Sequence, residues 1–493
     1  MNSKTVKIGL YSAGLRAYWA QFQNLRSRMD YYNNFVEEKL SQFGEVYNFG
    51  MVDNADKSEE AANYFQSNNV DIIFLHSATY FTSDCVLPIH LICKAPVVVL
   101  NLQPSPQIDY DNTDTGEWLS QCGACPVPEV SNAFQRAGIP FHCVNGCLGL
   151  EVTPECAMSD EKTFELPQAI RAWKEIEDWC RAAYVKANLQ TARFGFLGGN
   201  YSGMLDMYSD FTMMSAQAGI HLEILEMCDL NARLEKVSEE EIADKLKEIE
   251  DMFEMPVDSS ADARVFRPTD EQLRWSARVA VAQANMVKDY RLDALSYYYH
   301  SVDGNPYEEL QSGFIVGHSL LTANHVPCAG EADLKTALAM KICDLLDVGG
   351  SFAEIVVTDY INQTILIGHD GPFHIKISNQ KPILRGMGVY HGKRGSGISV
   401  EAKVQSGPVT TLNVTQTRDG KLKFIISEAE ATDDTIMKIG NTQTHIRFKD
   451  DVDTYMTKWF AEAPTHHCAL AVGHNAAVLE KVGILMDIPT VIL

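Results

Sequence analysis

Runs of apolar residues separated by amphipathic stretches dominate the first two thirds of the chain. Apolar runs at Val6–Tyr11, Val70–Leu75 and Val97–Asn101 are typical of buried strands, and helical periodicity fills much of the sequence between them. The same alternation resumes at Ala192–Leu197 and includes a long helix predicted over Glu271–Tyr290. Strands that alternate with helices form parallel sheets flanked by helices. The pattern therefore predicts two α/β units in succession.

The pattern changes after His369. Short stretches rich in Val, Ile and Thr, separated by Gly, Asp and Asn turns, predict antiparallel strands of a barrel or sandwich. They are Pro382–Val389, Val400–Gln405, Val409–Gln416, Lys421–Glu428 and His445–Phe448. The expected fold class is α/β. Two Rossmann-like parallel-sheet domains (residues 1–175 and 176–328) precede a mainly antiparallel β-barrel-like C-terminal domain (residues 329–493).

The composition of the chain excludes some classes of binding partner. The net charge of −24 argues against nucleic acid and anionic membrane, because both are bound through basic patches. No apolar run approaches the roughly 20 residues that span a bilayer, and a strand is predicted within ten residues of the start, so no signal peptide is expected. The 12 cysteines form no dense framework. We expect a cytoplasmic protein that acts on a small molecule.

Polar residues follow several predicted strands of the first unit. Ser12, His76, Ser77 and Gln103 each come at or just after the end of an apolar run. Ligands of parallel sheets lie beyond the carboxyl ends of the strands, so these side chains are expected near one crevice. Polar residues follow most strands in any protein, and that alternative stays open.

Two further motifs have a structural and a functional interpretation. Cys122 and Cys125 form a C-x-x-C, and Cys143 and Cys147 lie further along. The spacing is loose for zinc, so structural cysteines are the favoured interpretation over a zinc or redox role. The glycine-rich stretch Gly198–Gly203 lacks the nucleotide-binding spacing and predicts a turn or a close approach to a small polar ligand.

Two glutamates and a histidine stand at the predicted ends of elements near the start of the third domain. Glu331 is expected to open a helix that ends at Gly349–Gly350. Glu354 follows 23 residues after Glu331, and His369 lies in the glycine-flanked loop after a predicted strand. Carboxylate oxygens with an imidazole suit Mn²⁺ or a similar divalent ion.

The adjacent pair His466 and His467 is a further candidate for the same site. Neighbouring residues point to different faces of a helix or strand, so one can bind a metal while the other contacts another group. A histidine pair by itself is more often structural. Together with two carboxylates and a third histidine, it favours a metal site.

Several segments resemble the metal-site segments of the L-arabinose isomerase and L-fucose isomerase superfamily. They are GEADLKTA, SFAE, IGHDG and PTHHCAL, and RFGFLGGNYSGMLDMY resembles that family's second-domain opening. The likeness is closer to L-arabinose isomerase, because Glu354 stands two residues after a Phe and the final histidine lies in an HH pair. The resemblance implies that Glu331, Glu354, His369 and His467 (or, less favoured, His466) bind Mn²⁺, Co²⁺ or Mg²⁺. It also implies three domains, a homohexamer and aldose–ketose isomerisation in carbohydrate metabolism.

The sequence also departs from the family. The segment CGACPVPEV stands where those enzymes carry a histidine that reaches a neighbouring subunit's substrate, and the link between GEADLKTA and SFAE is shorter. These differences put L-arabinose itself in doubt more than isomerase chemistry. Asp359 is a rival to Glu354, which is preferred because SFAE matches in place. Lys335 is a candidate partner of Glu331 by helical spacing.

The chemistry of aldose–ketose isomerisation agrees with these residues. A proton moves between adjacent carbons through an enediol, which requires a base, proton exchange between two oxygens and a cation for the developing charge. Glu331 and Glu354 are the expected catalytic carboxylates. The alternatives are an isomerase of another sugar (L-fucose, D-arabinose or a modified sugar) and a non-catalytic sugar-binding protein, since paired Rossmann-like domains also build receptors.

Overall fold

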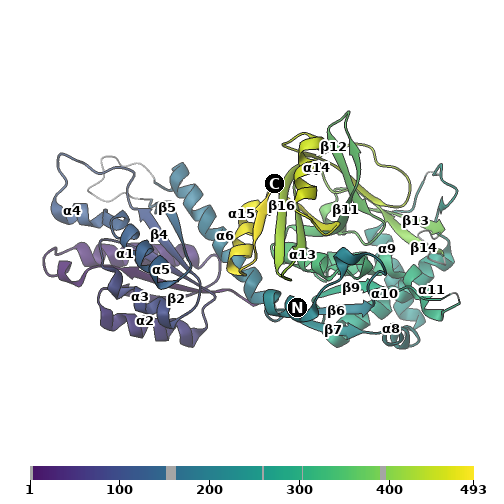
Figure 1. Cartoon of the computed structure of the whole chain (residues 1–493), viewed down its shortest axis with the longest axis horizontal. Coiled ribbons are helices and arrows are strands. Elements are labelled where there is room, and N and C mark those ends of the chain that lie inside the picture. The colour runs from purple at the N-terminus through teal and green to yellow at the C-terminus, as the bar shows by residue number, and fades with distance from the viewer. Residues whose placement is uncertain (1–3, 152–162, 258–259, 303, 389–395) are drawn as a thin grey trace. The chain divides into compact units, whose positions relative to one another are not determined.

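The computed structural model describes residues 4–151, 163–257, 260–302, 304–388 and 396–493. The chain forms two compact units, Asn2–Ala187 and Asn188–Leu493 (Figure 1). Helix α6 (Pro167–Leu189) runs to the boundary between them. Among the helices of the described ranges, none has both the length and the apolar character needed to cross a membrane.

The first unit is built on a five-stranded parallel sheet in the order β2-β1-β3-β4-β5. Its strands are β1 (Lys7–Ala13), β2 (Glu45–Val52), β3 (Ile72–Ser77), β4 (Val97–Gln103) and β5 (Phe141–Cys147). Besides α6, its helices are α1 (Leu25–Leu40), α2 (Ala55–Asn68), α3 (Leu87–Ile92), α4 (Thr115–Ser120) and α5 (Val127–Ala137). Strands β3 and β4 are almost wholly buried, as their continuous apolar runs predict for a sheet covered on both faces.

The second unit begins with a four-stranded parallel sheet in the order β10-β9-β6-β7. Its strands are β6 (Arg193–Gly198), β7 (His221–Leu225), β9 (Ala294–Tyr298) and β10 (Cys328–Ala329). The helices of this part are α7 (Phe211–Ala218), α8 (Met227–Leu234), α9 (Glu239–Met252), α10 (Asp270–Tyr290), α11 (Pro306–Ser312) and α12 (Phe314–Ala323). The chain leaves β6 toward β7 on one side and returns to β9 and β10 on the other. Such a reversal marks the position where open α/β sheets bind ligands.

A closed six-stranded antiparallel barrel follows in the same unit. Its strands succeed one another in the order β15-β18-β11-β12-β17-β16 and return to β15. They are β11 (Gly349–Asp359), β12 (Thr364–His369), β15 (Gly407–Gln416), β16 (Leu422–Ala431), β17 (Thr442–Phe448) and β18 (His467–Val472). Strand β19 (Thr490–Ile492) adds to β16 in parallel, and the helices are α13 (Leu334–Leu345), α14 (Val452–Ala461) and α15 (Ala476–Leu485). The predicted fold class, with two parallel sheets and an antiparallel barrel, is confirmed.

Some predicted elements differ from the structure. The strands expected at Pro382–Val389 and Val400–Gln405 are β13 (Ile383–Gly388) and β14 (Ser396–Glu401), and residue 389 lies outside the described ranges. These two strands do not join the barrel. They form a separate antiparallel sheet with the short strand β8 (Val265–Phe266). Local residue preferences predict a strand, but they do not specify its partner.

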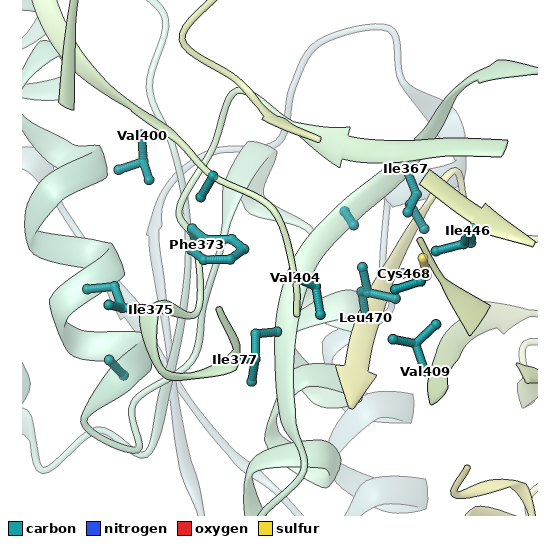
Figure 2. Close-up of a cluster of buried hydrophobic side chains, with 14 of the residues drawn as sticks. Ile367, Phe373, Ile375, Ile377, Val400, Val404, Val409, Ile446, Cys468 and Leu470 are labelled. Atoms are coloured by element: carbon teal, nitrogen blue, oxygen red, sulfur yellow. The ribbon is translucent and has the colours of Figure 1, made fainter. Parts of the chain in front are cut away.

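The barrel interior is apolar. Side chains from β12, β15, β17 and β18 meet there, and Figure 2 shows Ile367, Val409, Ile446, Cys468 and Leu470 pointing toward one another. Because side chains alternate along a strand, a residue next to an interior position faces outward. His467, next to the interior Cys468, therefore lies on the outer face of the barrel wall.

Candidate metal centre

Glu331 stands in a strained turn at the carboxyl end of β10. It lies in the 3₁₀ turn Gly330–Ala332 with φ 58° and ψ 15°, and Ala332 that follows has φ 60°. Helix α13 begins only at Leu334 with Asp333 as its N-cap, so the prediction that Glu331 opens this helix is wrong. Left-handed backbone at two successive non-glycine residues is costly and is found mostly where function requires a particular side-chain direction.

The barrel strands bring Glu354 and His467 together. In the antiparallel pairing of β11 with β18, Glu354 lies directly opposite His467. Directly opposite residues of such a pair share one face. On its other side Glu354 pairs with Gly368 of β12, and His369 follows as the last residue of that strand. His369 was expected in the loop after the strand, and it is instead held by pairing with Thr442.

The donor atoms of these residues converge. One ligand atom each from Glu354, His369 and His467 lies within 4.8 Å of the others, and the same is true of Glu331, His466 and His467. The Glu331 carboxylate is 3.9 Å from His369 Nε2 and 3.6 Å from His467 Nε2. Ligands about 2.1 Å from a divalent ion are about 3–4 Å from one another. The four predicted ligands thus fall in two groups that share His467, and the Glu331 carboxylate also lies near His369.

The three histidines of the site share one arrangement. Each has Nδ1 beside an aspartate, and each turns Nε2 toward Glu331. The Nδ1–carboxylate pairs are His369 with Asp370 (3.0 Å), His466 with Asp206 (2.6 Å) and His467 with Asp333 (3.1 Å). Metal-binding histidines are commonly oriented in this way, because a carboxylate on one ring nitrogen directs the other nitrogen to the metal.

His467 is the histidine best prepared to bind a metal. Its side chain is fully buried, and Nε2 has no hydrogen-bond partner among the described residues. Burial lowers the pKa of His467, which keeps the imidazole neutral as a ligand must be. The Phe352 ring lies 4.4 Å from the His467 ring and 4.6 Å from that of His369, centroid to centroid, and packs against both.

Asp333 fixes His467 and was missed by sequence reasoning. One carboxylate oxygen accepts from the backbone N–H groups of Lys335 and Thr336, and the other accepts from the Thr336 hydroxyl and lies 3.1 Å from His467 Nδ1. Burial alone would raise the pKa of Asp333, but the hydrogen bond with His467 and the nearby charge of Lys335 lower it. The sequence signal for Asp333 was its N-cap position before a helix.

His466 has a different character. Its side chain is 35% exposed, and Asp206 binds both its backbone N–H (3.0 Å) and its Nδ1 (2.6 Å). Burial would lower the pKa of His466, but its hydrogen bond to Asp206 and the nearby carboxylate of Glu331 raise the pKa to about 10. A charged imidazolium cannot bind a metal ion. Its Nε2 lies 3.8 Å from the Glu331 carboxylate, so His466 faces a predicted ligand.

Lys335 does not lie where helical spacing predicted. Its side chain is buried, and Nζ donates to Ser209 Oγ at 3.1 Å. Burial lowers the pKa of Lys335, while Asp333 and Asp206 act in the opposite direction. Asp359, the rival of Glu354, binds the turn that follows it through Ile361 and Asn362. Lys335 therefore supports the aspartates of the site, and Asp359 stabilises a hairpin.

A pocket of about 120 Å³ opens onto the centre. Glu331, His369 and Asp370 are among its lining residues, and the rest of its wall comes mainly from β9, α11, α12, β13 and β14 with their adjoining loops. The lining includes three successive tyrosines, Tyr297–Tyr299. A cavity needs roughly 10–15 Å³ by this measure to hold one water, so the pocket is large enough for several waters or a small polar molecule.

The polar residues at the carboxyl edge of the first sheet are occupied by protein partners. Ser12 Oγ lies 2.9 Å from His76 Nδ1, and Ser77 Oγ donates to the carbonyl of Gly123 at 2.5 Å. Gln103 donates to the side chain of Gln121 at 2.7 Å. Their proximity at the sheet edge was predicted, but their hydrogen bonds serve the fold.

No family model matches this sequence, and no curated protein matches it. Among solved structures, the chain is similar to a LacI family transcriptional regulator from Bifidobacterium animalis subsp. lactis DSM 10140, with 10% identity over 66% of this chain and 76% of that one, and a TM-score of 0.14. It is also similar to the glycosyltransferase SnogD from Streptomyces nogalater, with 12% identity over 70% and 84% of the two chains and a TM-score of 0.16. Scores this low carry no argument about fold or function.

Proposed function

We propose that this protein is a divalent-metal-dependent aldose–ketose isomerase, similar to L-arabinose isomerase. One observation carries the proposal: three histidines, each oriented by an aspartate, turn Nε2 toward the carboxylate of Glu331. The resemblance of the surrounding segments to the L-arabinose and L-fucose isomerase superfamily agrees with that geometry. Glu331, Glu354, His369 and His467 are the proposed metal ligands, and Glu331 and Glu354 the proposed catalytic residues.

The donor set fits a hard divalent ion. Two carboxylates and two imidazoles suit Mn²⁺, with Co²⁺ or Mg²⁺ as substitutes. The buried Nε2 of His467, which has no hydrogen bond within the described part of the chain, is the group whose desolvation a bound cation would offset. An ion held by these residues would supply Lewis-acid stabilisation of the negative charge that develops on the sugar oxygens.

In this proposal, side chains of the protein carry out the proton transfers. Glu331 and Glu354 are carboxylates that accept and return protons as the hydrogen moves between C1 and C2. The imidazolium of His466, held by Asp206, stabilises the ionised form of Glu331 at 3.8 Å. Together these groups keep a base available while the oxygens exchange protons.

The pocket is suited to a sugar. Its wall combines aromatic rings with a few polar groups, including Gln311 and Ser399, as small-molecule sites commonly do. Tyrosine hydroxyls both donate and accept hydrogen bonds and can therefore pair with sugar hydroxyls. This lining supports a sugar as the proposed class of substrate, and assays must identify the sugar itself.

Metal content and turnover test the proposal together. The purified full chain is stripped with a chelator, titrated with Mn²⁺, and assayed for ketose with L-arabinose, D-arabinose, L-fucose and other aldoses. We expect one ion per chain and ketose from at least one sugar. Sugar binding without metal would favour the non-catalytic sugar-binding protein. Absence of binding even with added Mn²⁺ would overturn the metal centre.

A further inference from the structure

The C-x-x-C motif of the first unit, Cys122 and Cys125, has no part in the proposed isomerase chemistry. Its backbone places the two cysteines on one side of a turn. Cys122 opens the 3₁₀ turn Cys122–Ala124, and Cys125 follows it with helical backbone angles (φ −61°, ψ −46°). In a 3₁₀ turn, side chains three residues apart lie one above the other. The spacing therefore brings the two sulfur atoms together.

The protein holds this turn in place from two sides. Gly123 lies against β3, where an added Cβ would come within 2.4 Å of the Ser77 carbonyl oxygen, and its own carbonyl accepts from Ser77 Oγ. Directly before the turn, Gln121 accepts from Gln103 at 2.7 Å and from Ser105 at 3.0 Å. Because the turn is held at both points, the positions of its two cysteines relative to each other are fixed.

The two thiols differ in access. Cys122 is 9% exposed, whereas Cys125 is at the surface. Burial, together with the neighbouring Cys125, raises the pKa of Cys122 to about 11. Cys125 is therefore the thiol that meets a reagent first, and Cys122 is shielded beneath it. Neither belongs to a group of three or more possible metal ligands within the described ranges, which leaves the zinc interpretation without support.

We propose that Cys122 and Cys125 form a reversible intrachain disulfide with a low-molecular-weight disulfide, of the glutathione class, as the oxidant. The thiolate of Cys125 attacks one sulfur of the oxidant and releases the first small thiol. The thiolate of Cys122 then attacks Cys125 Sγ and releases the second small thiol. Two protein thiols are oxidised, one external disulfide is reduced to two thiols, and no metal is involved.

The fully reduced full chain is incubated with glutathione disulfide, quenched by alkylation and analysed by peptide mass mapping. The expected product is a Cys122–Cys125 disulfide that a dithiol reductant reverses. The Cys122→Ser variant is expected to accumulate a stable mixed disulfide at Cys125, and the Cys125→Ser variant to leave Cys122 unmodified. Exposed Cys143 and Cys228 serve as internal controls, and we expect them to carry glutathione without forming an intrachain bond.

Two results would overturn the proposal. One is a wild-type chain in which glutathione stays on Cys125, because Cys122 would then be out of reach. The other is a chain in which neither thiol reacts under conditions that modify Cys143. Both outcomes are independent of the isomerase assay.

Discussion

Polar side chains gather at the carboxyl edges of both parallel sheets, but they are arranged differently at the two edges. At the edge of the first sheet, Ser12 and His76 bond to each other, and Asn33 donates to Ser12 at 2.8 Å. At the edge of the central sheet, Glu331 faces three histidine nitrogens at 3.6–3.9 Å, distances too long for hydrogen bonds. At the first edge the polar groups form hydrogen bonds with one another. At the second edge the histidine nitrogens face the Glu331 carboxylate without a hydrogen bond to it.

The histidines at the two edges differ in the groups that face their ring nitrogens. His76 is buried with a hydroxyl partner, and burial lowers its pKa to about 4, so it stays neutral and structural. The histidines of the metal centre each have a carboxylate behind Nδ1 and another carboxylate in front of Nε2. A buried polar atom without a hydrogen bond is costly, and the Nε2 of His467 is such an atom within the described residues.

The largest expected effect follows from removal of a proposed ligand at the central edge. Glu331→Gln and Glu354→Gln are each expected to remove stoichiometric Mn²⁺ binding and to lower turnover by about a thousandfold or more, because both metal and base chemistry are lost. Metal analysis and a ketose assay measure the two effects. Asp359→Asn, at the far end of the same strand as Glu354, is the matched control and should retain both. Wild-type activity in either glutamine variant would remove the catalytic assignment.

A smaller effect is expected from Asp333→Asn. An amide NH₂ facing Nδ1 would place the His467 proton on Nε2, which weakens Mn²⁺ binding by about 10–100-fold. Asp451 caps α14 through Thr454 as Asp333 caps α13, so Asp451→Asn controls for the lost cap. Mn²⁺ titration calorimetry separates the two variants. Equal Mn²⁺ affinity in the Asp333→Asn and Asp451→Asn variants would show that Asp333 acts only as a helix cap.

Asp206→Asn is expected to act on turnover more than on metal content. His466 loses its carboxylate partner, so its charge near Glu331 weakens. We expect a decrease in kcat of about tenfold, below the roughly 10²–10⁴-fold of direct acid–base catalysis, because His466 acts only through Glu331. Asp210→Asn alters a neighbouring carboxylate that caps α7 and should leave kcat unchanged. Loss of Mn²⁺ in the Asp206 variant would instead make His466 a structural part of the metal site.

The smallest effect on activity is expected at the first sheet, where His76 should influence stability alone. The folded-state pKa of His76 is about 4 and its ordinary value is 6.5, so the unfolded chain binds more protons between these values. The free energy of unfolding should therefore fall as pH decreases from about 6.5 to about 4, by about 3 kcal/mol from this residue. Urea unfolding at several pH values should show a shallower decrease for His76→Gln. His221→Gln, at an exposed histidine, is the control, and a slope equal to wild type in the His76 variant would contradict the linkage.

The sequence by itself determined the order of elements and the candidate ligands. Strands as apolar as Ile72–Ser77 and Val97–Gln103 are visible because burial on both faces requires continuous apolar residues. Glu331, Glu354, His369 and His467 were identifiable because carboxylates and histidines are rare beside apolar segments that end in glycine. The segment resemblance strengthened this set.

Only the tertiary structure decided what surrounds those ligands. Asp206 approaches His466 across 260 positions of sequence, and Asp333 approaches His467 across 134. No local pattern encodes such contacts, because they depend on the register of β11 with β18 and on the turn after β10. The left-handed backbone at Glu331 was equally hidden, since nothing in its residue type favours that conformation. Long-range strand pairing, which sequence periodicity does not specify, brought the candidate residues close together.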